Sequence, residues 1–246
     1  MEKDENKLTK TQVFNVIILD KSGSMNSIRD AAISGFNETL AGINKAQEQY
    51  ADTQDHFVSL FTFCSCEKKY VFDKVPVSEA RQLTEDDYVP CCRTPLYDAM
   101  GFTLSSIHNY VKNIEDSVVV ATIITDGMEN ASREYTGQAV KQLVERLKTE
   151  GWTFTYMGTN QDSIEVAFTL SIRNARNFDY SAQGTMAGMA KDASTRMNFF
   201  SRLARFKQEE ADMCINENAA IDANERHNRY AAMADEAFDE EERKSL

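Results

Sequence analysis

Apolar residues are distributed along this chain in two alternating patterns, one typical of strands and one typical of helices. Short apolar runs bounded by polar turn residues predict strands at 13–19, 56–63, 68–73, 117–125, 152–157 and 175–180. Apolar residues repeated every three or four positions predict helices at 28–50, 96–111, 138–150 and 162–170. Because strands and helices alternate, we expect an α/β fold with a doubly wound, mostly parallel six-stranded sheet and helices on both faces.

The last quarter of the chain has a different pattern, with two long helix-like stretches and no strand between them. Methionine and phenylalanine recur at helical spacing over 184–206, which predicts a helix that covers the end of the sheet. The stretch 219–243 is rich in Ala and Glu, with sparse apolar positions. We therefore predict a flexible polar tail at 1–10, one folded domain at 11–207 and an acidic, helical C-terminal extension at 208–246.

The charge of the chain limits the partners that it can have. The net charge is −12, and the residues from Glu209 onward carry 12 acidic side chains against four basic ones, a net charge of −8. Without a basic stripe to replace phosphate counterions, broad nucleic-acid binding is not expected. The chain also has no apolar run of about 20 residues and no signal-peptide pattern at its start, so we expect a cytoplasmic protein without membrane insertion.

A cluster of oxygen-bearing side chains follows the first predicted strand. Asp20-Lys21-Ser22-Gly23-Ser24 places one carboxylate and two hydroxyl groups at alternating positions. Such ligands, without nitrogen or sulfur, suit a hard divalent cation, with Mg²⁺ first and Mn²⁺ or Ca²⁺ as alternatives. This turn predicts one part of a metal site.

Two later stretches have the residues to complete that site. Thr94-Pro95 opens a predicted helix, with Thr94 as its expected N-cap because proline is favoured in the first helical turn. Asp126-Gly127 follows the most strongly β-branched strand, 117–125. In an open α/β sheet, ligands bind outside the carboxyl ends of strands where the chain connections change direction.

These three motifs together resemble a von Willebrand factor A-type domain of the bacterial, intracellular type. The resemblance covers roughly 10–207 and includes Asp-x-Ser-Gly-Ser-Met, Thr-Pro-Leu-Tyr-Asp-Ala-Met and Ile-Thr-Asp-Gly. In that family such motifs form a metal-ion-dependent adhesion site. The resemblance implies that Ser22, Ser24 and Thr94 bind the ion directly, whereas Asp20 and Asp126 act largely through water.

The implied function is that of a metal-dependent protein-interaction module, an adaptor or assembly factor without enzyme activity. The ion would keep one position open for an Asp or Glu of an unidentified partner protein. One alternative is a Mg²⁺-dependent phosphatase or hydrolase that uses the same site. It is disfavoured because Ser22 stands where an Asp-x-Asp motif would have its second carboxylate, and the motif of a serine hydrolase is missing. A structural role with a vestigial metal site is the other alternative.

Two features lie outside this pattern. The five cysteines are Cys64, Cys66, Cys91, Cys92 and Cys214, and an odd number favours reduced thiols. A Cys-x-Cys plus Cys-Cys zinc site is the alternative, although it lacks the usual C-x₂-C spacing. The acidic C-terminal extension either supplies a carboxylate to the metal in cis, from Glu209 or from 239–242, or only keeps the surface soluble.

Overall fold

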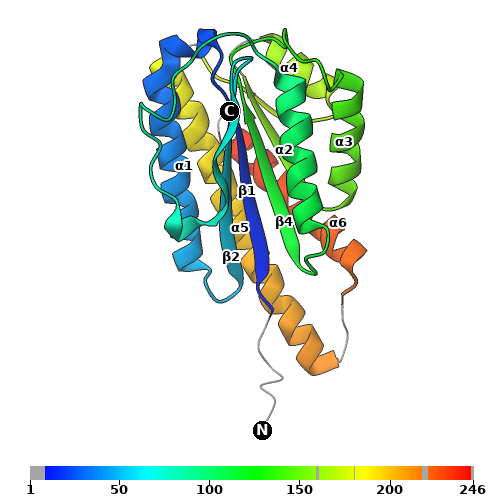
Figure 1. Cartoon of the computed structure of the whole chain (residues 1–246). Helices are drawn as coiled ribbons and strands as arrows, with labels where there is room; N and C mark the ends of the chain where they lie inside the picture. The colour runs from blue at the N-terminus through cyan, green and yellow to red at the C-terminus, as the bar shows by residue number, and fades with distance from the viewer. Residues whose placement is uncertain (1–8, 159–160, 180, 218–220, 245–246) are drawn as a thin grey trace.

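A computed structural model describes residues 9–158, 161–179, 181–217 and 221–244 of the chain (Figure 1). Within these ranges a central sheet separates two layers of helices, as the alternating pattern predicts. The predicted flexible tail falls almost entirely outside the described residues, as does Tyr180 at the end of the last predicted strand. No described helix combines the length and the apolar character that crossing a membrane requires.

The sheet has six strands in the order β3-β2-β1-β4-β5-β6, and all neighbours are parallel except the pair β2 and β3. Its strands are β1 (Thr11–Asp20), β2 (Gln54–Phe63), β3 (Lys68–Pro76), β4 (Ser117–Ile124), β5 (Thr153–Gly158) and β6 (Asn174–Asn177). The strand order reverses direction between β1 and β4, so the sheet has its switch point there. The predicted six-stranded, mostly parallel sheet is confirmed.

The central strand β1 shows why both faces of the sheet are covered. Alternate side chains of a strand point to opposite faces, so Phe14, Val16 and Ile18 pack into one apolar cluster while Ile17 and Leu19 pack into another. All five are buried. A strand buried on both faces is read in the sequence as an uninterrupted apolar run, as 13–19 is.

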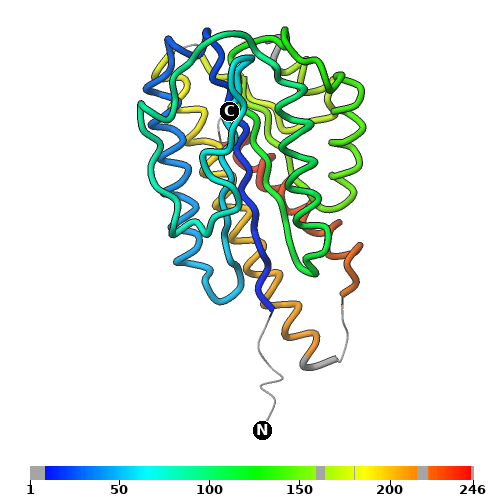
Figure 2. The backbone as a smooth tube through the Cα atoms, in the orientation of Figure 1, coloured from blue at the N-terminus to red at the C-terminus, as the bar shows by residue number. Residues whose placement is uncertain are grey.

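Six α-helices of the described residues surround the sheet. They are α1 (Arg29–Gln49), α2 (Leu96–Val111), α3 (Gly137–Thr149), α4 (Gln161–Thr169), α5 (Ala182–Glu217) and α6 (Ala223–Arg243). The apolar clusters place α2, α3 and α4 against one face, and α1, α5 and α6 against the other. Short 3₁₀ helices, η1 (Gly23–Ile28) and η2 (Val77–Glu79), follow β1 and β3. The loops that follow β1 and β4 gather at the end of the molecule opposite the start of β1 (Figure 2).

At two places the local structure differs from what the sequence pattern indicates. Ser27 and Asp30 have the spacing of a capping box, but η1 occupies 23–28 and the Ser27 hydroxyl donates to the Ser24 carbonyl oxygen instead. The long helix predicted at 184–206 continues to Glu217. Position 208 therefore lies inside α5, and the domain boundary placed there stays a prediction.

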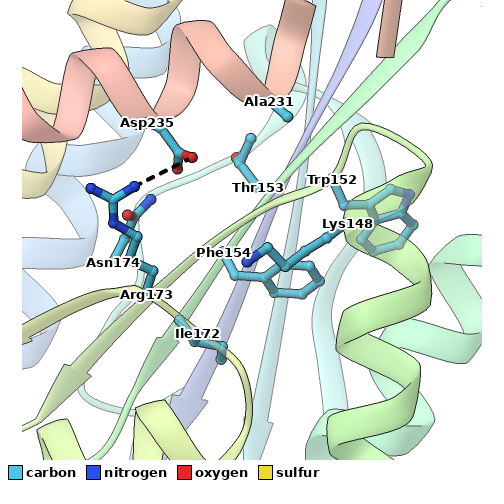
Figure 3. Close-up of a pocket in the computed structure, with 9 residues that line it drawn as sticks. All are labelled: Lys148, Trp152, Thr153, Phe154, Ile172, Arg173, Asn174, Ala231 and Asp235. Atoms are coloured by element: carbon cyan, nitrogen blue, oxygen red, sulfur yellow. Dashed lines mark ion pairs between the residues drawn. The ribbon is translucent and has the colours of Figure 1, made fainter. Parts of the chain in front are cut away.

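The C-terminal helix α6 is docked against the body of the protein. Its buried residues Tyr230, Ala234 and Ala237 join a cluster that includes Phe200 and Leu203 of α5. Beside α6, a cavity of about 40 Å³ lies next to Trp152, Arg173 and Asp235 (Figure 3). This volume is large enough for little more than water, so we regard the cavity as a packing gap.

Candidate metal centre

Strand register brings the two predicted carboxylates to one place. Leu19 of β1 pairs with Ile124 of β4 in the parallel ladder. Asp20 ends β1, and Thr125 and Asp126 follow β4 directly, so all three project from the same edge of the sheet. This is the switch point between β1 and β4, where ligand sites of open α/β sheets form.

Asp20 is fully buried, and its carboxylate is held by two neutral donors. The Ser22 backbone N–H donates to Oδ1 at 2.7 Å, and the Thr125 hydroxyl donates to Oδ2 at 2.6 Å. Burial raises the pKa of Asp20 to about 6, although both hydrogen bonds act in the opposite direction. The nearby Asp126 carboxylate adds to the rise in pKa. A cation at this place would offset that cost.

The two serines link Asp20 to Asp126. The hydroxyl oxygens of Ser22 and Ser24 lie 3.2 Å apart, and the Ser24 hydroxyl donates to Asp126 Oδ1 at 2.7 Å. Asp126 is half-buried and Ser24 is exposed, so this side of the cluster is open to solvent. A ligand can therefore reach the Ser24 hydroxyl and Asp126 from outside, whereas Ser22 is buried.

Thr94 comes to the same cluster from a different loop. A methyl group placed on Gly127 would lie 2.9 Å from Thr94 Oγ1 and 3.6 Å from both Asp20 Oδ2 and Ser24 Oγ. Oxygen atoms from two separate segments, 20–24 and the one that carries Thr94, thus lie around one point beside Gly127. The absence of a side chain at Gly127 keeps that point clear, because any larger residue would occupy it.

The predicted N-cap role of Thr94 is wrong. Helix α2 begins at Leu96, Pro95 takes the N-cap position, and no side-chain hydrogen bond caps the helix from that position. The Thr94 backbone is fixed by Asn130 instead: the Thr94 N–H donates to Asn130 Oδ1 at 3.0 Å, and the Asn130 N–H donates to the Thr94 carbonyl at 3.1 Å. The Thr94 hydroxyl is thereby kept for the centre of the cluster.

Sequence reasoning missed the residues that hold the two loops together. Glu129 accepts hydrogen bonds from the backbone N–H groups of Tyr97, Ala131 and Ser132, so its carboxylate joins the start of α2 to the loop after β4. Asn130 and Thr125 act beside it, as described above. Their position in the sequence could have identified them, because Glu129 and Asn130 come directly after Asp126-Gly127-Met128 in a polar stretch.

Asp98 strengthens the same connection. Burial alone would raise its pKa, but hydrogen bonds from Lys68 and from the backbone N–H groups of Tyr135, Glu134 and Arg133 outweigh burial and lower the pKa to about 2. A carboxylate with so many donors stays ionised at neutral pH. Asp98 therefore fixes the start of α2 and leaves the ligand position to other residues.

A polar cleft of about 570 Å³ adjoins the cluster on the Thr94 side. It is lined by Ser65, Lys68, Arg93, Pro95, Asp98 and residues 130–134. Lys68 is paired with Asp98 at 2.9 Å. The side chains of Arg93 and Arg133 are exposed, and neither has an ion-pair partner among the described residues. The lining thus carries three basic side chains against the two carboxylates of Asp98 and Glu134, a net charge of +1 on an acidic protein.

The donor set fits a hard divalent cation. The five predicted residues Asp20, Ser22, Ser24, Thr94 and Asp126 offer only carboxylate and hydroxyl oxygens, which Mg²⁺, Mn²⁺ and Ca²⁺ prefer. Their hydrogen bonds and the open point beside Gly127 show that these oxygens converge. Their role as metal ligands remains a proposal, which we argue below.

Comparison with known proteins supports the fold. No family model and no curated protein matches the sequence. Among solved structures, the pilus adhesin SpaC from Lactobacillus rhamnosus GG aligns over 78% of this chain and 31% of its own, with 16% identity and a TM-score of 0.59. Proximal thread matrix protein 1 from the mussel byssus aligns over 75% of this chain and 46% of its own, with 13% identity and a TM-score of 0.50.

A third structure, the VWA domain of SpRpn10, aligns over 73% of this chain and 94% of its own, with 11% identity and a TM-score of 0.46. A likeness this distant carries no argument. This chain spans about a third of SpaC and under half of the mussel protein. The first two likenesses show the fold alone, an α/β fold with a six-stranded, mostly parallel sheet.

Proposed function

We propose that the chain is a metal-dependent protein-interaction module whose bound Mg²⁺ takes a carboxylate from a partner protein. Asp20, Ser22, Ser24, Thr94 and Asp126 would hold the ion. The observation that carries this proposal is the convergence of oxygen atoms from two loops on the point beside Gly127, in the loop that also carries Asp126. Asp20 is buried there without a cationic hydrogen-bond partner, and a divalent ion would offset its charge.

The hydrogen bonds of the two aspartates support their assignment to an outer shell. Asp20 already accepts hydrogen bonds at both of its oxygens, and Asp126 accepts one from Ser24. Mg²⁺ retains several waters and binds few protein carboxylates directly. With the carboxylates acting through water, the ion would stay electrophilic toward an additional anionic ligand.

The basic side chains of the cleft support an acidic partner. Thr94 and Asn130 form one side of the cluster, and Arg93 and Arg133 lie on that side. Both arginines are available for ion pairs. Opposite charges on two partners accelerate association and favour one orientation of docking. We propose that a partner segment places one Asp or Glu on the ion and further acidic residues along this cleft.

The metal assignment is tested by titration with Mg²⁺ and Mn²⁺, followed by calorimetry or by the paramagnetic signal of Mn²⁺. We expect one ion per chain in the wild type and none in Asp20→Ala or Asp126→Ala, with the fold unchanged in circular dichroism. Asp52→Ala, which removes an exposed carboxylate elsewhere, is the matched control. Unchanged titration in both site variants would refute the metal site.

The partner assignment needs a separate experiment. Proteins captured by the wild type in Mg²⁺ should be released by EDTA and should not be captured by Asp20→Ala. Arg93→Ala combined with Arg133→Ala should weaken capture while metal affinity stays at the wild-type level. Capture that persists in EDTA would rule out a metal-bridged interaction and leave the structural alternative.

The enzyme alternative gains no support from the histidines, which are the usual general bases at neutral pH. His56 lies in β2 and contacts Gln54, and burial lowers its pKa to about 4. His108 of α2 pairs with Glu150 at 2.8 Å, and His227 belongs to α6. We therefore infer a binding function, and turnover of a phosphate or ester substrate that depends on Asp20 would refute that inference.

A further inference from the structure

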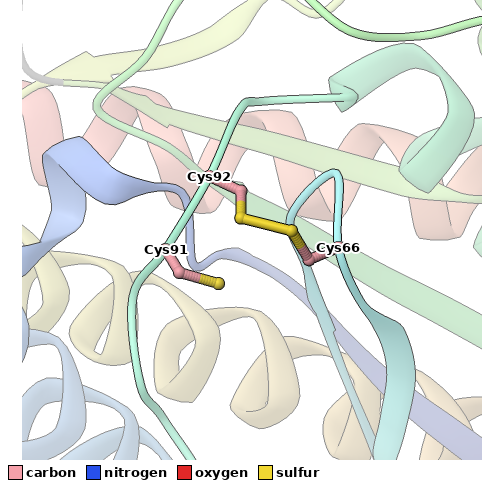
Figure 4. Close-up of side chains that lie close together, drawn as sticks. All are labelled: Cys66, Cys91 and Cys92. Carbon is pink, nitrogen blue, oxygen red and sulfur yellow. A yellow bond between two sulfur atoms is a disulfide. The ribbon is translucent and has the colours of Figure 1, made fainter.

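Four of the five cysteines form one cluster beside the candidate metal centre. Cys64 follows β2, Cys66 lies in the turn to β3, and Cys91 and Cys92 lie in the segment that leads to Thr94. The sulfur atoms of Cys66, Cys91 and Cys92 all lie within 4.8 Å of one another (Figure 4). The Cys64 sulfur lies 3.5 Å from that of Cys91.

One pair in this cluster is oxidised in the structure. Cys66 and Cys92 form a disulfide, whereas Cys64 and Cys91 carry thiols. The sequence favoured reduced thiols throughout, and for this pair the structure differs. A disulfide alone uses two sulfurs, and it gives no reason for two further thiols to lie against the bonded pair.

The backbone at Cys92 explains how adjacent residues reach the same cluster. Consecutive side chains of an extended segment point in opposite directions. Cys92 has a φ of 64°, a left-handed conformation that is uncommon for residues other than glycine, Asn and Asp. This turn in the backbone lets the side chains of Cys91 and Cys92 point toward the same place, where their sulfurs are found. Such an outlier is a reason to look for function.

We propose that the reduced chain binds one zinc ion through the sulfurs of Cys64, Cys66, Cys91 and Cys92. Zinc favours four thiolate ligands in a tetrahedral arrangement, with Zn–S distances of about 2.3 Å, which puts neighbouring sulfurs ~3.8 Å apart. The sulfurs of Cys66, Cys91 and Cys92 lie within 4.8 Å of one another, and that of Cys64 lies 3.5 Å from that of Cys91. Once the disulfide is reduced, side-chain rotations of the four cysteines would bring the sulfurs to this spacing. The irregular C-x-C plus C-C spacing is compensated by the turn at Cys92.

Zinc binding and the disulfide are two alternative states of the same sulfurs. The ion displaces four protons from four thiols, and no sulfur changes its oxidation state. From the disulfide form, a thiol or phosphine reductant must first supply two electrons, and two protons complete the thiols of Cys66 and Cys92. Oxidation of that pair removes two of the four ligands and so excludes zinc.

The local contacts show what such a site would stabilise. The Cys91 N–H donates to the Lys21 carbonyl at 2.8 Å, and the Gly23 N–H donates to the Cys92 carbonyl at 3.1 Å. The cluster is thus bonded through the backbone to the loop that carries Ser22 and Ser24. Zinc would hold that loop and the Thr94 segment in one arrangement.

Cobalt and zinc binding by the whole chain test this proposal. The protein is reduced with a phosphine, freed of metal and titrated with Co²⁺ in excess Mg²⁺, which prefers oxygen ligands and leaves thiols unoccupied. We expect one Co²⁺ per chain, with the sulfur-to-cobalt charge-transfer band and the intense visible bands of a tetrahedral thiolate site. One equivalent of Zn²⁺ should abolish these bands.

Variants identify the ligands. Cys66→Ser and Cys91→Ser should each weaken zinc binding by more than the roughly 10- to 100-fold that loss of an outer-shell partner costs. Cys214→Ser, which changes an exposed cysteine of α5, should bind like the wild type, and so should Asp20→Ala. A reduced wild type that binds Co²⁺ without a sulfur charge-transfer band would overturn the proposal, and that measurement does not depend on the folding of any variant.

Discussion

At the amino ends of β1 and β4, the carboxylate of Asp116 is buried against a cation of the chain itself. Lys207 lies 2.5 Å from its Oδ2, and Tyr230 donates to its Oδ1 at 2.8 Å. At the carboxyl ends of the same two strands, Asp20 is buried as completely, but its hydrogen bonds come from neutral donors alone. The two carboxylates thus differ in charge compensation, although they have similar burial.

The amino-end network is complete within the chain. Glu210 joins it, because its carboxylate lies 2.8 Å from the Lys207 amine and 2.6 Å from the Arg226 guanidinium. Charges of α5 and α6 thus balance one another beside the amino ends of β1 and β4. A buried ion pair of this kind specifies which elements dock, even where its net contribution to stability is small. The carboxyl-end cluster lacks such compensation, and an incomplete polar cluster at a switch point is typical of a binding site.

The largest expected effect lies at the amino end. Asp116→Ala would leave Lys207 buried with only Glu210 to balance it, and the Tyr230 hydroxyl with only the Thr11 hydroxyl, at 3.3 Å, as a partner. We expect the free energy of unfolding to fall by about 3 kcal/mol, measured in urea, because breaking a buried pair leaves an uncompensated charge. Mg²⁺ affinity of the folded variant should match that of the wild type. A loss under about 1 kcal/mol would mean that the network is not structural.

A smaller effect is expected from titration of Asp20 in the metal-free protein. Since burial raises the pKa of Asp20 to about 6, from 3.8, the folded protein holds this proton more tightly than the unfolded chain. The free energy of unfolding should therefore fall as pH rises from about 4 to about 6, by on the order of 3 kcal/mol. Above that range the penalty persists until a cation offsets it.

The matched variant for this titration is Asp20→Asn, which keeps the shape of the side chain and removes its charge. Its stability should not show the fall between pH 4 and 6, and added Mg²⁺ should stabilise only the wild type at pH 7. Urea unfolding at several pH values gives both results. If the stability of the two proteins depended on pH in the same way, the charge of Asp20 would be compensated in the folded protein. The contrast between Asp20 and Asp116 would then be wrong.

These two ends also show how far the sequence predicts the molecule. Strand and helix positions, the edge strand and the convergence of Asp20 with Asp126 follow from local periodicity together with the rule that parallel strands end at one edge. The alternative that the acidic extension supplies a carboxylate to the metal in cis has no such basis. Asp239, Glu240 and Glu242 instead pair with cations of α5, β6 or the loop before β6.

The features that the sequence did not predict correctly depend on contacts between residues far apart in the chain. Thr94 was expected to cap α2, but Glu129 and Asn130, more than 30 positions away, hold the Thr94 segment and the helix start. Likewise, Asp116 and Lys207 are separated by 91 positions, and nothing in either local pattern shows that they meet. Buried polar pairs have no periodic signature, so the sequence alone does not predict them.

A further test at the carboxyl end concerns Ser24. Its hydroxyl donates to Asp126 and lies 3.2 Å from that of Ser22, so Ser24→Ala should weaken Mg²⁺ binding by roughly 10-fold or more. The stability of the metal-free protein should change by less than about 1 kcal/mol because the residue is exposed. Ser34→Ala, on the exposed face of α1, is the control for calorimetric titration. Equal affinity in both variants would remove Ser24 from the site.

The smallest effect is expected where charges are paired but exposed. Arg202 of α5 and Glu236 of α6 lie 2.6 Å apart, and the Glu236 side chain is 64% exposed. Glu236→Ala should lower the free energy of unfolding by about 0.2 to 1 kcal/mol, less in high salt, because water and ions screen such pairs. If this variant instead lost as much stability as Asp116→Ala in urea, ion pairing itself would explain the docking of α6. Buried ion pairs of the amino-end network and exposed ion pairs of the same helices would then contribute equally to stability, whatever their burial.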